Sequence, residues 1–409
     1  MPGVCLIVLA HHAERLRHLQ EFDVDDARPG VAVSPDDYLD VKATDESLMA
    51  RATELLLPGL KLLIELVEDA GARLAFAPSG GLLRSADRHD DVRGAIERLA
   101  SRHHDVELVA SPWDRSLGGV LPAMHVTGAV RRCMDEIEHR LGNRPVTAVN
   151  VAGVYDDAIA AQFAAAGASC VLCGHADAAL DGRTANRLYH APGNGPRVMT
   201  RNVALSDDLA LRTRDPSWDC HPLSPETYAD WLAGAIANTH GESVPIFLHL
   251  ADLFRDDDTV ASMLQALPKL IEQRGLEMDL PRDVVHRQGK HAELLSMPRT
   301  TSSWSPGHDL SPWLGNAMQS NALQLLLSAH AQLRESEEGA EALSLLSAAD
   351  HLGWMRYRPY DSTIRRQSLY EPADMSVVTQ EQRRRPTPFD NAYDAYLDHT
   401  LALRHWLRR

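Results

Sequence analysis

Histidine and carboxylate side chains follow or interrupt several apolar runs of this 409-residue chain. Residues of these types can transfer protons or bind metal ions. His11 and His12 follow the first apolar run, and Asp252 follows a later one. Glu107 lies within a run that is otherwise apolar, where an unpaired carboxylate would be costly. We therefore expect Glu107 to be paired or to line a pocket.

The same residues argue against a metal centre. His11 and His12 would point in opposite directions along a strand, so only one of them could face a site. No second pair of histidines lies at helical spacing nearby, and Cys170 and Cys173 lack a second ligand pair at the spacing of a zinc site. We expect these two cysteines to be buried thiols, and we expect neither a metal ion nor an organic cofactor.

Short apolar runs alternate with longer segments of helical spacing over about the first 280 residues. Such alternation predicts βα units and a largely parallel sheet. The runs are apolar at nearly every position, as strands covered on both faces are. The strand candidates are Val4–Leu9, Leu74–Pro78, Val106–Ala110, Val146–Val151, Cys170–Cys173 and Ile246–Leu250. The helix candidates are 47–70, 129–141, 156–166 and 225–237.

The pattern changes from about residue 290 onwards. Helical spacing is found over 310–333, 340–354 and 389–407, and no convincing alternating strand lies among them. The stretch 365–388 is polar and contains prolines, which is typical of a surface loop. We predict an α/β barrel over residues 1–285 and a helical domain over 286–409.

Composition and charge limit the kinds of ligand. With 41 basic and 57 acidic residues, the formal net charge is −16. Such a surface disfavours nucleic acid and anionic membranes and is compatible with a neutral polymer. The apolar start Met1–Ala10 lacks a basic region and is too short to span a bilayer. Together with five cysteines, an odd number, it predicts a cytoplasmic protein with reduced thiols.

Several short segments carry a family resemblance over roughly residues 4–355. They are Leu9–Ala13, Leu55–Leu66, Phe76–Gly80, Asp105–Val109, Arg201–Leu209, Asp309–Asn316 and Asp350-His351. In this order and spacing they resemble the α-amylase-like members of glycoside hydrolase family 57. The resemblance implies a (β/α)7 barrel, an incomplete relative of the TIM barrel, with a helical C-terminal region. It also implies retaining chemistry on α-1,4-glucans without a cofactor.

The resemblance and the positions along the chain together suggest residues that contact an α-glucan or a malto-oligosaccharide. These candidates are His11, Glu107, Trp113, Trp304, Asp309, Trp313 and Asp350. The ends of barrel strands carry substrate-contacting groups, and tryptophan rings stack on sugars. Each candidate also has an ordinary explanation. The histidine could be satisfied by backbone groups, the tryptophans could belong to a core, and Asp309 could cap a helix.

Two positions depart from the family pattern. A retaining glycosidase uses two carboxyl groups that flank the scissile bond, one as nucleophile and one as acid/base. Alignment on the family's third motif places Ala152 at the nucleophile position. The strand that should carry the acid/base aspartate has His249 or Leu250 in its place. The sequence therefore predicts a glucan-binding or regulatory protein without normal retaining activity.

Two alternatives remain open. An active α-glucan hydrolase or glucanotransferase would use displaced carboxylates, with Asp252, Glu107 and Asp157 as candidates. It would bring two carboxyl groups to about 5–5.5 Å for retention, or about 6.5–9.5 Å for inversion. A partner-binding scaffold, or a homo-oligomer, would instead have its cleft closed by side chains and a large apolar patch elsewhere.

Overall fold

The computed structural model describes most of the chain. The described residues are 2–16, 38–193, 195–239, 241–255, 257–298, 301–305, 307–333 and 340–355, with six further positions between 393 and 403. The predicted loop at 365–388 and most of the predicted helix at 389–407 lie outside these residues.

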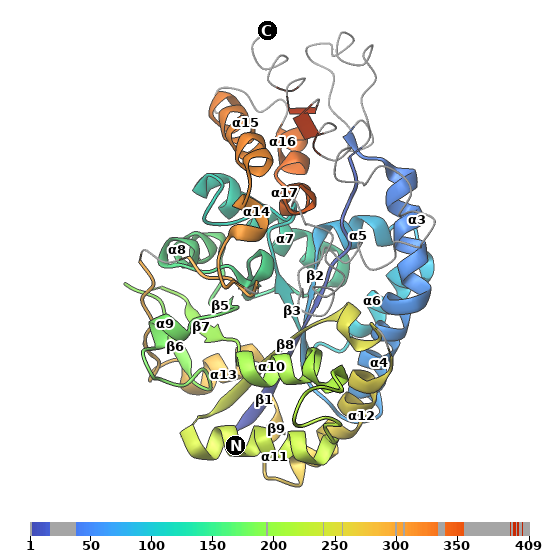
Figure 1. The fold of residues 1–409 in the computed structure, drawn as a ribbon, viewed down its shortest axis with the longest axis vertical. Helices are drawn as coiled ribbons and strands as arrows, with labels where there is room; N and C mark the ends of the chain where they lie inside the picture. Colours follow the sequence, from blue (N-terminus) through green and yellow to red (C-terminus); the bar gives the residue numbers. More distant parts are fainter. Residues whose placement is uncertain are drawn as a thin grey trace.

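Seven parallel strands form the centre of the molecule (Figure 1). In spatial order they are β8 (Ser243–His249), β1 (Gly3–Ala10), β2 (Leu74–Pro78), β3 (Val106–Ala110), β4 (Thr147–Val149), β5 (Cys170–Cys173) and β7 (Arg197–Thr200). Three short strands flank them: β6 (Leu188–His190), β9 (Glu277–Met278) and β10 (Glu293–Leu294). The curled sheet confirms the predicted α/β fold of the (β/α)7 type.

The barrel is incomplete between β7 and β8. The hydrogen-bonded sheet ends at β8 on one side and passes from β7 to β6 and β10 on the other. The backbone N–H of Asn202, just after β7, donates to the carbonyl of Pro245 in β8 over 2.9 Å. Pro245 itself has no N–H to offer a neighbouring strand, which suits a strand at the edge of a sheet.

Fifteen described α-helices surround or cap the sheet. They are α3 (Val41–Arg51), α4 (Leu57–Glu68), α5 (Gly80–Ala86), α6 (Asp90–Ala100), α7 (Ala123–Leu141), α8 (Asp157–Ala166), α9 (Asp177–Leu180), α10 (Val203–Ala210), α11 (Pro225–Thr239), α12 (Thr259–Glu272), α13 (Pro281–Gln288), α14 (Ser311–Leu314), α15 (Ala317–Leu333), α16 (Ala340–Leu346) and α17 (Ala349–Trp354). None of the helices in the described part of the chain combines the length and apolarity needed to cross a bilayer.

The alternating directions of strand side chains divide the core into two clusters. In β1, Val4, Leu6 and Val8 pack outward against the helices, whereas Cys5 and Ile7 pack with the interior residues of the other strands. Both sets are buried. This explains why the strand sequences are apolar at almost every position rather than at every second one.

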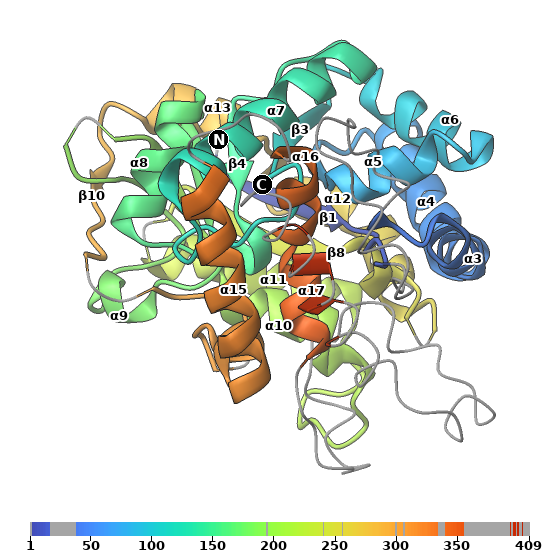
Figure 2. The same ribbon diagram turned by 90° about the horizontal axis from the view of Figure 1, so that it is seen from above.

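The C-terminal helices lie across one end of the barrel. In Figure 1 the helices α14 to α17 occupy the end of the molecule opposite the N-terminus, and Figure 2 looks onto that end. The backbone N–H of Ala349, at the start of α17, donates to the carbonyl of Arg115 in the segment after β3 over 3.0 Å. Ser116 forms an isolated β-bridge with Ala348. The helical region therefore meets the carboxyl ends of the strands, where barrel sites are built.

The packed interior of the barrel generates a first prediction. Ile7 is fully buried among the interior residues, so Ile7→Ala should lower the free energy of unfolding by about 2–5 kcal/mol. Chemical denaturation followed by circular dichroism measures this change. The matched control, Val146→Ala, truncates a side chain that is 42% exposed and should have little effect. Equal effects of the two substitutions would contradict a packed barrel interior.

Candidate functional site

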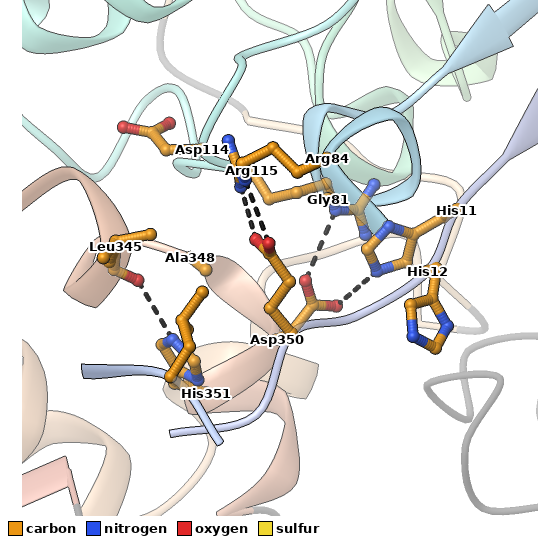
Figure 3. Close-up of a pocket in the computed structure, with 12 residues that line it drawn as sticks. His11, His12, Gly81, Arg84, Asp114, Arg115, Leu345, Ala348, Asp350 and His351 are labelled. Atoms are coloured by element: carbon orange, nitrogen blue, oxygen red, sulfur yellow. Dashed lines mark hydrogen bonds and ion pairs between the residues drawn. The ribbon is translucent and has the colours of Figure 1, made fainter. Parts of the chain in front are cut away.

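His11 connects the barrel to the helical region. Its Nδ1 lies 3.0 Å from the hydroxyl of Ser79, which follows β2. Its Nε2 lies 3.0 Å from the Oδ1 of Asp350 in α17, as Figure 3 shows. Burial, followed by the charge of Arg115, lowers the pKa of His11, so the ring is neutral at neutral pH. Nε2–H therefore donates to the carboxylate, and Nδ1 accepts from the Ser79 hydroxyl.

Ser79 and Arg115 hold this pair in place. The Ser79 hydroxyl caps α5 by accepting from the N–H of Leu82 over 3.2 Å, which fixes the oxygen that faces His11. The Nε of Arg115 lies 3.5 Å from the Oδ2 of Asp350. Arg115 adopts a left-handed backbone conformation with φ of 61°, a costly conformation for a residue with a Cβ.

Asp350 is an ionised carboxylate at this site. Burial alone would raise the pKa of its carboxyl, but the neighbouring His11 and Arg115 outweigh burial and hold the pKa well below its usual range. Since His11 is neutral at neutral pH, Arg115 supplies the lasting positive charge and His11 supplies a hydrogen bond. Asp350 can therefore accept further hydrogen bonds but cannot donate a proton at neutral pH.

A polar pocket surrounds these residues. It is lined by charged or polar side chains from both the barrel and the helical region (Figure 3): His11, His12, Glu14, Arg84, Asp114, Arg115, Asp350 and His351. The space open to the centres of water molecules is ≈ 10 Å³, about enough for a single water. As described, this pocket is too small for a sugar ring, which would have to bind above it or displace its walls.

Asp114 is a second buried link between the barrel and the helical region. It is 3% exposed, and its Oδ2 lies 2.9 Å from the Nε2 of His125 in α7. The hydroxyl of Ser344 in α16 donates to the same oxygen over 2.9 Å. Burial would raise the pKa of Asp114, but His125 and the hydrogen bonds of Ser116 keep that pKa well below its usual range. The carboxylate therefore holds α16 against the barrel.

Ala152 is the residue that the resemblance aligns with the nucleophile. Asn150 follows β4 and caps a short 3-10 turn, Val151–Gly153, that contains Ala152. Ala152 is 5% exposed and has a left-handed backbone with φ of 52°. Its carbonyl accepts the N–H of Trp304 over 2.8 Å. A methyl group at this place can neither attack a sugar nor stabilise positive charge.

His249 or Leu250 is the residue that the resemblance aligns with the acid/base. His249 is the last residue of β8, whereas Leu250 begins a 3-10 turn and is buried. Burial, together with the charges of Arg255 and Arg115, lowers the pKa of His249 to about 4, although Asp252 opposes this shift. His249 is therefore uncharged at neutral pH and is a poor proton donor there.

The three carboxylates proposed as displaced catalysts have separate structural partners. Asp252 is fully buried, accepts the N–H of His249 over 2.9 Å and pairs with Arg255 at 2.5 Å. Glu107 is 2% exposed and accepts hydrogen bonds from the hydroxyl of Thr147 and from the N–H of Arg282. Arg282 is the second residue of α13.

Asp157, the third of these carboxylates, lies in the first turn of α8. It accepts the N–H of Met297 over 2.8 Å and the hydroxyl of Ser296 over 2.9 Å. Its neighbour Asp156 caps α8 by accepting the N–H of Ile159 over 2.8 Å. The structure thus gives each of the three displaced-catalyst candidates a bonding role in a different part of the fold.

The aromatic candidates are buried in this structure. Trp113 is 1% exposed, Trp304 is 2% exposed and Trp313 is 6% exposed. The guanidinium of Arg84 lies 5.0 Å from the ring centroid of Trp113. Asp309 is exposed and accepts the N–H of Ser311 over 2.9 Å, which forms a turn just before α14. Their roles as glucan contacts stay predictions.

The last candidates for chemistry are the two cysteines of β5 and any group of side chains that could hold a metal ion. Cys170 and Cys173 are buried, as predicted, and burial raises the pKa of Cys173 to about 12, so its thiol stays protonated. Within the described ranges, no three histidine, cysteine, aspartate or glutamate side chains are grouped so that they could hold a metal ion.

The partly buried His249 generates a prediction about how the stability of the fold depends on pH. Its pKa in the fold lies below the value of about 6.5 expected in the unfolded chain, so the unfolded state takes up the proton first. The stability that this residue contributes is complete above about pH 6.5 and is lost as the pH falls towards 4. In His249→Asn, the free energy of unfolding, measured by chemical denaturation, should lose this part of its pH dependence, on the order of 3 kcal/mol. His139→Asn, at an exposed position of α7, serves as the control.

The backbone after β4 generates another prediction. Gly153 has φ of 59°, and a Cβ there would lie 2.6 Å from the Cα of Gly174, so Gly153→Ala must displace backbone. We expect it to lower the free energy of unfolding by about 2 kcal/mol or more. Gly94→Ala, in open space within α6, should instead stabilise by about 0.5–1 kcal/mol. Similar thermal shifts for the two variants would contradict this tight turn.

The chain is similar in sequence and in fold to known proteins. A putative α-amylase of Methanocaldococcus jannaschii is 26% identical over 377 residues, which cover 88% of this chain and 77% of the relative. An α-amylase of Thermotoga maritima has a similar structure with a TM-score of 0.58 at 12% identity, covering 99% of this chain and 96% of the other. A branching enzyme of Thermococcus kodakaraensis, solved with glucose, has a TM-score of 0.59 at 11% identity, covering 87% and 86%.

The family assignment rests on a match over most of the chain. The model of glycosyl hydrolase family 57 matches residues 11–298 of the 409. This range begins at His11 and contains the strand ends that carry Ala152 and His249. The chain therefore belongs to glycosyl hydrolase family 57.

Proposed function

We propose that the protein binds α-glucans at the carboxyl ends of its barrel strands and does not run the normal retaining reaction. The observation that carries this proposal is the pair Ala152, in the turn after β4, and His249, at the end of β8, where the family resemblance requires two carboxyl groups. Double displacement needs both groups, whereas binding needs hydrogen-bonding groups and a suitable surface. The division into a barrel over 1–285 and a helical domain over 286–409 is part of this proposal.

Family membership and charge support an α-glucan as the ligand. Relatives are named α-amylase and branching enzyme, and the structure of the branching enzyme was solved with glucose. The ionised oxygens of Asp350 can accept hydrogen bonds from sugar hydroxyls, and His11 fixes the orientation of this carboxylate. The net charge of −16 is compatible with a neutral malto-oligosaccharide.

An active α-glucan hydrolase or glucanotransferase is the second candidate function. The names of the relatives favour an active enzyme, because two of them are called α-amylases and one is called a branching enzyme. Asp252 is the displaced carboxylate that touches the acid/base position, since it accepts the N–H of His249. For Asp252 to act, it would have to leave Arg255 and face a second carboxyl group across the substrate.

Calorimetric titration with maltoheptaose, beside a sugar-release assay on the same sample, tests the first function. We expect saturable binding without release of sugar. Asp350→Asn removes the charge that accepts hydrogen bonds and should weaken binding about tenfold or more, since a charge-assisted hydrogen bond contributes about 1.5–3 kcal/mol. Glu138→Gln, on the exposed side of α7, should bind like the wild type.

The same assay separates the alternatives. Sugar release that disappears in Asp252→Asn but persists in Glu138→Gln would overturn the non-catalytic proposal in favour of a displaced-carboxylate enzyme. Neither binding nor release would overturn both functions and direct attention to a protein partner or a homo-oligomer. Thermal denaturation of each variant shows whether it is folded, so that a loss of binding is not confused with unfolding.

A further inference from the structure

A single residue, Trp304, contacts both of the positions where the family resemblance expects catalytic carboxyl groups. The backbone N–H of Trp304 donates to the carbonyl of Ala152 over 2.8 Å. The indole of Trp304 stacks on the ring of His249, with centroids 4.7 Å apart and an interplanar angle of 19°. An aromatic ring of this chain therefore lies between β4 and β8, where a sugar ring would be cleaved in a retaining enzyme.

The indole is tightly packed there. The guanidinium of Arg201, which follows β7, lies 4.4 Å from the Trp304 ring centroid, and Phe247 meets the ring edge-on at 5.9 Å. A Cβ at Gly174 would lie 2.9 Å from the Cβ of Trp304. Trp304 is 2% exposed and packs with the residues inside the barrel rather than with those outside it. The ring therefore fills the mouth of the barrel between β4, β5, β7 and β8.

The segment 301–305, which we call the Trp304 strap, is anchored by a few hydrogen bonds. Ser302 and Tyr155 exchange backbone hydrogen bonds of 3.1 and 2.9 Å, and the Ser302 hydroxyl donates to the carbonyl of His175. The Thr301 hydroxyl donates to the Oδ2 of Asp156 over 3.0 Å. The strap belongs to no helix or long strand, so its withdrawal would break these bonds and the bond from Trp304 to Ala152, and would expose the indole.

Two stacked histidines fasten the end of the strap. His308 lies over His175 with ring centroids 3.7 Å apart and an interplanar angle of 7°. The N–H of His308 donates to the carbonyl of Ser305 over 2.8 Å, and the N–H of Ser303 donates to the carbonyl of His308 over 3.2 Å. The imidazole stack thus connects the loop after β5 to the strap.

Protonation would oppose this stack. Burial, followed by the facing His308, lowers the pKa of His175, and Arg201 acts in the same direction. Asp177, whose Oδ2 lies 3.5 Å from the Nε2 of His175, acts in the opposite direction. A proton on His175 would place a positive ring against His308 and near Arg201, which disfavours the stack.

We propose that the Trp304 strap is a gate over the barrel mouth and that the neutral His175–His308 stack is its latch. A glucan ring enters when the indole withdraws, and this part of the inference rests on the proposed function. Acidification that protonates His175 weakens the latch and exposes Trp304. Trp304 is then an internal occupant of the site, whereas a sugar-stacking platform would present its ring to the ligand.

Fluorine NMR of protein labelled with 5-fluorotryptophan tests the gate directly. The chain has seven tryptophans, and the Trp304 resonance is identified by its disappearance in Trp304→Phe. At pH 7.5 we expect that resonance to show no shift between H₂O and D₂O, because the ring is buried. At pH 5 we expect a solvent-sensitive Trp304 resonance, while Trp113, identified by Trp113→Phe, stays insensitive.

Variants of the latch distinguish an effect of His175 from a general loosening of the fold at low pH. His175→Phe keeps an aromatic ring against His308 but cannot take a proton, so the Trp304 resonance should remain insensitive to solvent at pH 5. His139→Phe, at an exposed position of α7, should behave like the wild type. A Trp304 resonance that stays buried at pH 5 in the wild type overturns the latch. So does an unchanged pH response in His175→Phe.

Maltoheptaose supplies the final arm of the experiment. Trp304→Ala removes the occupant and should tighten binding about tenfold, whereas weaker binding by a folded Trp304→Ala would make Trp304 a stacking platform and overturn the gate. Calorimetric binding to the wild type without any change in the Trp304 resonance would overturn the gate and leave the proposed function intact. Exposure of Trp304 at pH 5 without binding by any variant would leave the gate intact and overturn the proposed function.

Discussion

The buried carboxylate of Asp350 is the interaction on which the rest of the site depends. A negative charge in a packed interior is tolerated only when it is paired and hydrogen-bonded, and here His11 and Arg115 meet both needs. These partners belong to the barrel, whereas Asp350 belongs to α17. The same contact that stabilises the charge therefore fixes the helical region over the strand ends, together with the hydrogen bond from Ala349 to Arg115.

Much of the fold could be predicted because parallel strands bury both faces. The runs containing Ile7, Phe76 and Phe247 are apolar at nearly every position, and each forms a strand of the barrel. Strand β7 (Arg197–Thr200) was not predicted, because its four residues begin with an arginine and end with a threonine. Short strands with polar ends give no periodicity that distinguishes them from a loop.

The site was predicted less completely, because its contacts join distant parts of the chain. His11 could be proposed from its place after an apolar run, but its partner Arg115 could not. Arg115 reaches Asp350 from a left-handed backbone conformation, and the sequence has no glycine or asparagine at this position that would predict such a conformation. Ser79 did carry a signal, since a serine before Gly80 can cap a helix. Nothing in the sequence indicates that Trp304 meets both Ala152 and His249.

The backbone at Ala152 has a consequence for protein engineering. A left-handed residue with a Cβ is less favourable by about 1–2 kcal/mol, and any longer side chain there would meet an already packed surface. Ala152→Glu would therefore place a charge among packed groups, next to the segment that carries Trp304. An engineered carboxylate at this position requires coordinated changes in separate segments of the chain.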